Sequence, residues 1–219
     1  MKSRWLGTWF AALTLAFISA CASAQPYSGP PQLQAGREFN RLEPPRPVAT
    51  GSRIEVIEFF YYGCSICYEA QPALSRWLVT APEYVAFRMV PVVSADNWEP
   101  FAKLFYTIEA LGQIGRLHWP IYDNFHFDGL KLNDDKVMLE WVTRNGVDGQ
   151  KFSEFYASPE IRARVDQARK TVEAYDVRGV PTFVIDGKYV TSARLAGGTK
   201  QMMNVVDELV KRARRERPN

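Results

Sequence analysis

Two cysteines three positions apart are the residues of this 219-residue chain best suited to chemistry. Cys64 and Cys67 follow Gly63, where the apolar stretch Ile54 to Phe60 gives way to a helical pattern. A disulfide across so short a gap removes little entropy from the unfolded chain, so the pair would be a poor structural staple. At a helix N-terminus, unpaired backbone N–H groups and the positive end of the helix dipole favour a thiolate. The spacing therefore predicts a redox-active pair in which Cys64 is the more acidic and exposed thiol and Cys67 the more buried one.

Two other interpretations of the pair involve no redox chemistry. The cysteines could simply pack in the core, or they could form half of a zinc site. A zinc site would need two more ligands, and the only histidines are His118 and His126, which lie in an aromatic stretch where packing is the commoner role. An acidic thiol favours instead an oxidising couple, because a low thiol pKa stabilises the reduced form of the pair.

The N-terminus has the pattern of an export signal. Lys2 and Arg4 precede an apolar run of fifteen residues, Leu6 to Ala20. This run is shorter than the about 20 residues that a membrane-spanning helix needs. Ala22-Ser23-Ala24 supplies the small residues of a cleavage site before Gln25. We therefore expect residues 1–24 to be a signal peptide and the mature protein to reach an oxidising compartment.

Cys21 has two alternative fates in an exported protein. Cleavage after Ala24 would remove it and leave 195 of the 219 residues; the formal charge would fall from +3 to +1, because Lys2 and Arg4 leave too. Ile18-Ser19-Ala20-Cys21 also resembles a lipobox, in which Cys21 would become the lipidated first residue of a lipoprotein. A buried N-terminal helix is the third interpretation of this segment.

Composition narrows the class of protein. Hydrophobic residues make up 47% of the chain and charged residues 23%, which is typical of a globular protein rather than a disordered one. A chain of this length can bury a core without disulfide staples, which excludes a disulfide-built mini-protein. The small net charge argues against a nucleic-acid partner, and the basic cluster Lys211 to Arg217 is by default a solvated helix end.

The rest of the chain has the pattern of a small mixed sheet with one helical insertion. Apolar runs predict buried strands, 3- and 4-residue spacing predicts helices, and Asp186-Gly187 predicts a hairpin turn. After a Pro-rich lead-in at 25–53, we expect strands at 54–60, 85–93, 182–185 and 188–191, and helices at 64–79 and 199–214. We assign 54–96 and 177–219 to the sheet domain and 97–176 to an inserted helical domain, in which Ser158-Pro159 begins one helix.

These features together resemble the DsbA family of bacterial periplasmic thiol–disulfide oxidoreductases. The resemblance is carried by Glu58-Phe59-Phe60, by Cys64 to Cys67, by Arg178 to Phe183 and by the segment Asp186 to Tyr189. It covers roughly residues 40–214. It implies an α/β thioredoxin fold with a helical domain inserted between the second and third core strands. It also implies a periplasmic location.

The resemblance assigns roles to three residues outside the cysteine pair. Pro181 matches the family's cis-proline, which lies opposite the active disulfide. Val180 would offer its backbone to an extended client segment, a form of strand addition. Glu58 matches a buried acid beneath the cysteines, and a buried carboxyl with a raised pKa could exchange a proton with Cys67.

The resemblance implies partners and no cofactor beyond the redox-active disulfide itself. The clients would be unfolded exported proteins, a membrane quinone reductase of the DsbB type would re-oxidise the pair, and the protein would be a monomer. The chain departs from the family between the cysteines, because Ser65-Ile66 replace the usual Pro-His. Since that histidine helps to stabilise the thiolate, the departure bears on the strength of oxidation.

The leading hypothesis is therefore an enzyme, a protein dithiol oxidase that uses Cys64 and Cys67. A periplasmic reductase or isomerase would use the same pair in another direction, although isomerases of this superfamily usually carry an added dimerisation domain that the lead-in is too short to form. A non-catalytic chaperone module that holds exported clients is the alternative of a different class.

Overall fold

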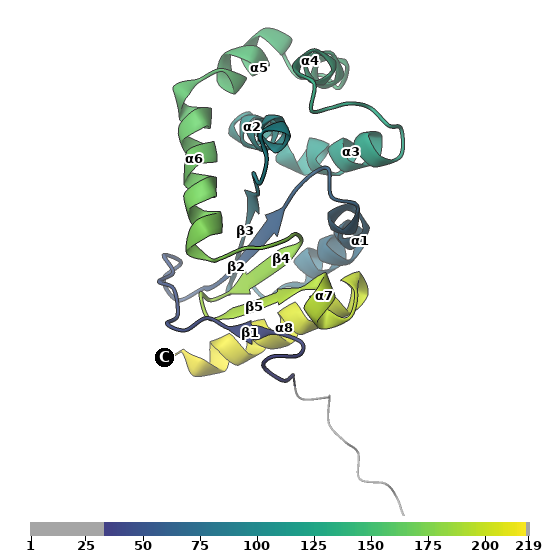
Figure 1. Ribbon diagram of the computed structural model, residues 1–219. Helices are drawn as coiled ribbons and strands as arrows, with labels where there is room; N and C mark the ends of the chain where they lie inside the picture. The colour runs from purple at the N-terminus through teal and green to yellow at the C-terminus, as the bar shows by residue number, and fades with distance from the viewer. Residues whose placement is uncertain (1–32, 218–219) are drawn as a thin grey trace, which may run out of the picture. The chain divides into compact units, whose positions relative to one another are not determined.

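The computed structural model describes residues 33–217, which contain the whole expected fold (Figure 1). The expected signal peptide at 1–24 and the lipobox ending at Cys21 lie outside the described residues. Within 33–217, no helix is long and apolar enough to cross a membrane.

A five-stranded mixed sheet forms the centre of the fold, in the order β1-β5-β4-β2-β3. The strands are β1 (Asn40–Arg41), β2 (Ile54–Phe60), β3 (Val85–Pro91), β4 (Thr182–Ile185) and β5 (Tyr189–Ser192). Every residue of β2 is buried, as its continuous apolar run predicts for a central strand. β3 pairs with β2 in parallel and β4 pairs with it antiparallel. β2 therefore lies between two other strands, and the chain that leaves its last residue, Phe60, leads directly to the cysteines.

Two long helices pack on the same face of the sheet. These are α1 (Ser65–Thr80) and α8 (Thr199–Glu216), which contact each other, while α8 also contacts β2, β4 and β5. Their apolar side chains form one core with Ile54 and Val56 of β2. Because side chains alternate along a strand, Glu58 projects to this same face. The short helix α7 (Ala193–Ala196) joins β5 to α8.

The helical insertion lies between β3 and β4 in the chain. After the short 3₁₀ helix η1 (Asp96–Trp98), its helices are α2 (Glu99–Ala110), α3 (Ile114–His126), α4 (Asp135–Arg144), α5 (Gly149–Tyr156) and α6 (Pro159–Ala174). Ser158 caps α6, accepting a hydrogen bond from the backbone N–H of Ile161 at 3.2 Å. A second core joins Phe59 and Phe60 of β2 to the insertion. The predicted fold class is confirmed: an α/β thioredoxin fold with a helical domain between the first two and the next two long strands.

The hairpin between β4 and β5 turns at Asp186 and Gly187. Both residues have a positive φ angle, 54° at Asp186 and 62° at Gly187. This is the conformation that an Asp-Gly turn predicts. β5 begins one residue later than expected, at Tyr189. The lead-in also contains a strand that the sequence pattern did not predict: β1 pairs antiparallel with β5, Asn40 opposite Val190.

Candidate active site

Cys64 is the N-cap residue of α1. Its backbone is extended (φ −89°, ψ 117°), and its sulfur accepts a hydrogen bond from the backbone N–H of Cys67 at 3.3 Å. An N-cap side chain normally satisfies one of the free N–H groups of the first helical turn, and here a sulfur does so. The helix therefore holds Cys64 at its positive end, with the side chain half-buried.

The surroundings of Cys64 favour its thiolate. The Cys67 thiol hydrogen-bonds to it and lowers the pKa of Cys64 to about 7; burial opposes this, and the backbone N–H groups of Cys67 and Ile66 add to the lowering. At neutral pH a large fraction of Cys64 is ionised. A thiolate is both the better nucleophile and the better leaving group in disulfide exchange.

Cys67 has the opposite character. Its side chain is fully buried, and burial first, then the neighbouring Cys64, raise the pKa of the Cys67 thiol far above its usual value. Both thiols are free in this structure. The pair thus combines one acidic, accessible thiol with one buried thiol that holds its proton.

Glu58 lies beneath the pair on β2 and is fully buried. Its register neighbours are Met89 on β3 and Phe183 on β4, so neither strand offers it a cation. Burial raises the pKa of Glu58 to about 8, and the amide of Gln71 offsets part of this rise. The Gln71 amide lies near this carboxyl but does not reach hydrogen-bond geometry, so among the described residues neither carboxylate oxygen has a hydrogen-bond partner. The carboxylate charge of Glu58 raises the pKa of the Cys67 thiol, so the two groups are close enough to interact electrostatically.

Val180 and Pro181 close the site from the other half of the sheet domain. The peptide bond between them is cis. The Sγ atom of Cys64 lies 3.6 Å from the carbonyl oxygen of Val180, so residues 116 positions apart meet at the sulfur. Thr182 fixes the approach to β4, because its hydroxyl donates to the carbonyl of Gly179 at 2.7 Å.

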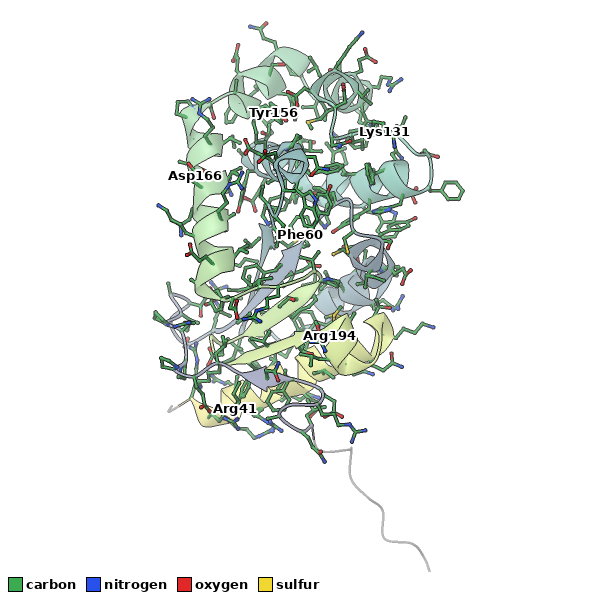
Figure 2. The ribbon with its side chains drawn as sticks, in the orientation of Figure 1. Arg41, Phe60, Lys131, Tyr156, Asp166 and Arg194 are labelled. Atoms are coloured by element: carbon green, nitrogen blue, oxygen red, sulfur yellow. The ribbon has the colours of Figure 1, made fainter. Side chains whose placement is uncertain are left out.

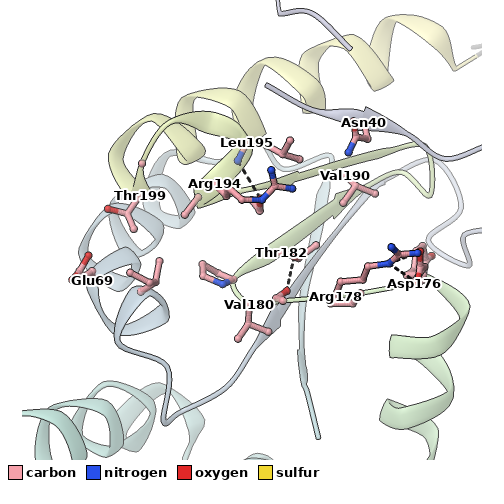
Figure 3. Close-up of a pocket in the computed structure, with 18 of the residues that line it drawn as sticks. Asn40, Glu69, Asp176, Arg178, Val180, Thr182, Val190, Arg194, Leu195 and Thr199 are labelled. Carbon is pink, nitrogen blue, oxygen red and sulfur yellow. Dashed lines mark hydrogen bonds and ion pairs between the residues drawn. The ribbon is translucent and has the colours of Figure 1, made fainter. Parts of the chain in front are cut away.

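A groove of about 1040 Å³ runs from this point along β4, β5 and α7 (Figure 3). Ile66, Val180, Pro181, Val190 and Leu195 give it an apolar lining. Charged side chains stand at its margins: Glu69 beside the cysteines, Arg194 on α7, and the ion pair of Arg178 with Asp176 at 2.8 Å. Such a channel suits an extended peptide that lies next to Cys64.

The histidines lie in an aromatic cluster. His118 Nδ1 is 2.8 Å from the hydroxyl of Tyr62, and His126 Nε2 is 2.8 Å from the backbone oxygen of the same tyrosine. Burial lowers the pKa of His118 to about 4, so it is neutral at physiological pH. No group of three or more metal-binding side chains forms within residues 33–217.

The structure brings Cys64, Cys67 and Val180 into contact, sets Pro181 in the adjoining groove and places Glu58 below. Sequence reasoning missed two participants. Gln71, one helical turn after Cys67, could have been found because the i, i+4 spacing puts both on one face of a helix. The α7 side of the groove had no signal, because four residues are too few to show a helical period.

Comparison with known proteins gives consistent matches. The family model of the DsbA-like thioredoxin domain matches residues 79–210. The thiol:disulfide interchange protein DsbA of Azotobacter vinelandii is 36% identical over 185 residues, which cover 84% of this chain and 86% of that protein. The protein of the same name from Pseudomonas aeruginosa is 33% identical over 180 residues, or 82% of this chain and 85% of that one. The crystal structure of Pseudomonas aeruginosa DsbA superposes with a TM-score of 0.79, covering 84% of this chain and 95% of that chain.

Proposed function

This chain belongs to the DsbA family, and from that premise we propose that it is a thiol:disulfide oxidoreductase that introduces disulfide bonds into exported proteins through Cys64 and Cys67. The observation that carries the proposal is the opposite character of the two thiols. Cys64 has a pKa lowered to about 7, whereas Cys67 is fully buried. A thiolate stabilised in the reduced state makes the disulfide state less stable, so the pair draws electrons from its clients.

The reaction begins when a client thiolate attacks the Sγ atom of Cys64 in the Cys64–Cys67 disulfide. The disulfide breaks, a mixed disulfide forms, and Cys67 leaves as a thiolate. Glu58, protonated below its pKa of about 8, is the acid that gives Cys67 its proton. Cys67 then remains a thiol, because burial disfavours its charge.

A second client thiolate then attacks the client sulfur of the mixed disulfide. The client disulfide forms and Cys64 leaves as a thiolate, which the helix N-terminus and the Cys67 thiol stabilise. Two electrons have passed from two client thiols to the pair. The histidine that the family usually carries between the cysteines is absent, and the Cys67 thiol supplies the stabilisation in its place, with the backbone N–H groups of Cys67 and Ile66 adding to it.

The groove gives the client its orientation. A client segment in extended conformation would lie along Val180 and Pro181, with its cysteine sulfur at Cys64 and its apolar side chains against Val190 and Leu195. The carbonyl oxygen of Val180 lies 3.6 Å from the Sγ atom of Cys64, which supports this placement of the client.

The remaining expectations complete the proposal. Residues 1–24 would direct export to the periplasm, with lipidation of Cys21 as the alternative to cleavage. Residues 25–53 form the lead-in, 54–96 and 177–219 the sheet domain, and 97–176 the helical domain. A membrane quinone reductase of the DsbB type would take the two electrons, and the protein would act as a monomer without another cofactor.

Oxidation of a two-cysteine peptide by the oxidised protein tests the function. We expect stoichiometric peptide disulfide, and loss of activity in Cys64→Ser. The double variant Cys64→Ser/Ser153→Cys is the matched control, because it restores the number of thiols at an exposed position of α5. An active control would show that any thiol suffices and would contradict the assigned site.

The equilibrium of the pair with glutathione distinguishes the two directions. A reduction potential well above thioredoxin's, which is about −270 mV, supports the oxidase. A potential near that value would instead support the reductase. Client binding that survives loss of both cysteines, without any turnover by the intact protein, would favour the chaperone module.

A further inference from the structure

The end of the sheet domain farthest from the cysteines carries a cluster of basic side chains, here called the basic end. It is built from β1, the lead-in, the β4–β5 hairpin and the last turns of α8. Its cationic residues are Arg41, Arg46, Arg53, Lys188, Arg212, Arg214, Arg215 and Arg217. Figure 2 shows Arg41 at the foot of the view, opposite Lys131 and Tyr156 at its head.

Contacts within this end hold these elements together. Arg217 pairs with the buried carboxylate of Asp186, and Lys188 pairs with it at 3.2 Å. Arg214 donates to the carbonyl oxygen of Ser52 at 3.3 Å. A hollow of about 720 Å³ lies between these side chains, and Arg46 also lines it. These contacts join the lead-in, the hairpin and the last turns of α8, so their basic side chains do not belong to independent tails.

Most of its arginines lack an acidic partner. Of the eight cations, only Lys188 and Arg217 have a carboxylate within 4.0 Å among residues 33–217. Arg46, Arg53 and Arg215 are exposed and make no side-chain hydrogen bond among the described residues. Arg53 follows Ser52 and Arg215 follows Arg214, and these two neighbours contact each other, while Arg46 lines the same hollow as Arg214. The three unpaired charges therefore add to a positive field at this end of the fold.

The opposite charge lies at the other end. Counting Glu43, Glu83, Asp186 and Glu216 against its eight cations, the basic end sums to +4. The helical insertion at 97–176 sums to −3, from 10 cationic and 13 acidic side chains. Residues 33–217 as a whole sum to only +1, from 25 cationic and 24 acidic side chains. The charge is thus separated along the molecule and not merely in excess.

The basic end is also where the chain enters the fold. Arg212 donates to the carbonyl oxygen of Leu33, the first described residue, at 3.3 Å. The sequence before it contains the apolar run Leu6 to Ala20 and the lipobox cysteine Cys21. Twelve residues connect Cys21 to Leu33 and can span at most about 40 Å. A protein attached through Cys21, or still carrying its signal, would have this end within reach of the bilayer.

We propose that the basic end docks the protein on an anionic phospholipid surface. The cations would meet the lipid phosphates while the acidic helical insertion is repelled, so the molecule binds in one orientation. The apolar face of α8 is buried in the core against β2. Docking is therefore electrostatic and without insertion of the helix into the hydrocarbon.

The docked orientation keeps the site free. Asp186 follows Ile185, which pairs with Val56 near the start of β2, whereas Cys64 follows the end of that strand. A seven-residue strand is about 20 Å long. Docking at one end of β2 therefore leaves Cys64 and its groove open to soluble clients.

Vesicle sedimentation tests the proposal on the chain from Gln25 onward, which retains both cores because these lie wholly within 33–217. We expect binding to vesicles of phosphatidylcholine mixed with phosphatidylglycerol, no binding to pure phosphatidylcholine, and release in about 0.5 M NaCl, where the Debye length falls to a few ångströms. Arg46→Gln/Arg53→Gln/Arg215→Gln should weaken binding at least tenfold and leave peptide oxidation unchanged. Inorganic phosphate should release the protein no better than chloride of equal ionic strength.

The matched control is Lys131→Gln/Lys136→Gln/Arg144→Gln, which removes the same charge from exposed positions in or beside α4. It should bind as the unaltered protein does. Equal loss in both triple variants would overturn the proposal, because net charge alone would then explain binding. Displacement by phosphate at low concentration would overturn it in favour of a discrete anion site. Equal binding to both vesicle types would overturn it as well.

Discussion

The two cysteines are three residues apart, and their pKa values shift in opposite directions because they occupy different positions on the helix. Cys64 caps the helix and its sulfur receives N–H groups, whereas Cys67 lies one turn inside and is fully buried. Helix capping, the Cys67 thiol and the burial of Cys67 in the core together create the asymmetry that disulfide exchange needs. Of the two residues between them, Ile66 contributes a backbone N–H group, and neither Ser65 nor Ile66 has an ionisable side chain.

Cys64 should titrate well below an ordinary thiol. Thiolate absorbance of the reduced protein should rise with a midpoint near pH 7, and Cys64→Ser should abolish that rise. Above this pKa the reduced pair binds one proton instead of two. Its reduction potential should therefore fall by about 60 mV per pH unit below pH 7 and by about 30 mV above it. A single slope through pH 9 would contradict the assigned pKa.

The same lowered pKa makes the stability of the reduced protein depend on pH. A thiol whose folded pKa lies below its unfolded pKa adds stability as the pH rises through the folded value and loses it as the pH falls. The reduced form should gain stability relative to the oxidised form between about pH 7 and pH 9. Chemical denaturation of both forms across this range measures the difference.

Glu58 should act on stability in the opposite sense. Its folded pKa of about 8 means that the folded state holds a proton that the unfolded state releases above about pH 4.5. Stability is therefore lost as pH rises from about 4.5 to 8. Glu58→Gln should be more stable than the unaltered protein, by about 4 kcal/mol at pH 8 and by little at pH 4.

Urea denaturation of the two proteins at several pH values measures this gap. The variant should also slow formation of the mixed disulfide, since the amide cannot protonate Cys67. A gap that stays constant between pH 5 and pH 8 would show that Glu58 titrates normally.

Among the elements, the β4–β5 hairpin depends on one glycine. Gly187 has a φ of 62°, and a Cβ atom there would overlap the carbonyl oxygen of Arg46. Gly187→Ala should therefore cost at least about 2 kcal/mol of the free energy of unfolding. Thermal or urea denaturation measures the loss.

Gly51→Ala is the matched control for the hairpin. Gly51 has nearly the same φ, 59°, but a Cβ atom there would meet nothing within 4 Å. This variant should lose only the cost of the backbone conformation, about 1 kcal/mol. Equal losses at both positions would show that the lead-in can move away from the hairpin.

The elements that the sequence predicted well are those with a clear period. The continuous apolar run predicted β2 from Ile54 to Phe60, and Ser158-Pro159 predicted the start of α6. β1 has only two residues, too few to show the two-residue period of a strand, and its pairing with β5 spans 148 positions between Arg41 and Tyr189. Pairing over such distances is a tertiary property that local patterns do not contain.

The same contrast between local pattern and long-range contact holds for the residues of the candidate site. Cys64, Cys67 and Gln71 share one helix, and their spacing shows that they share a face. Val180 meets Cys64 only through the closure of the whole fold, and the family resemblance was needed to connect them. The missing hydrogen-bond partners of Glu58 depend on Met89 and Phe183 as neighbours, which only the strand register reveals.

At the scale of the whole molecule, the insertion and the sheet share a core. Phe60 of β2 packs against Phe105 of α2, with ring centroids 5.1 Å apart, and against His118 of α3 at 5.5 Å. Neither part can unfold without exposing the apolar surface of the other. We therefore expect one cooperative unfolding transition for both parts.

Tryptophan fluorescence can test this cooperativity. Trp77 lies in the core between α1 and α8, whereas Trp98, Trp119 and Trp141 lie in the helical insertion. In the chain from Gln25 onward, which lacks Trp5 and Trp9, the variant Trp77→Phe reports the insertion alone, and far-ultraviolet circular dichroism reports both parts. Coincident midpoints are expected in urea, and separated midpoints would show that the insertion is an independent folding unit.

The shortness of β1 limits the free edge of the sheet. The exposed edge of a sheet is a template on which other strands aggregate. This sheet ends in a strand of two residues, Asn40 and Arg41, and the chain then runs into Pro44, Pro45 and Pro47, which have no N–H to donate. At the other edge, α6 and α2 contact β3. Little free sheet edge is therefore left on which another polypeptide could add a strand and aggregate.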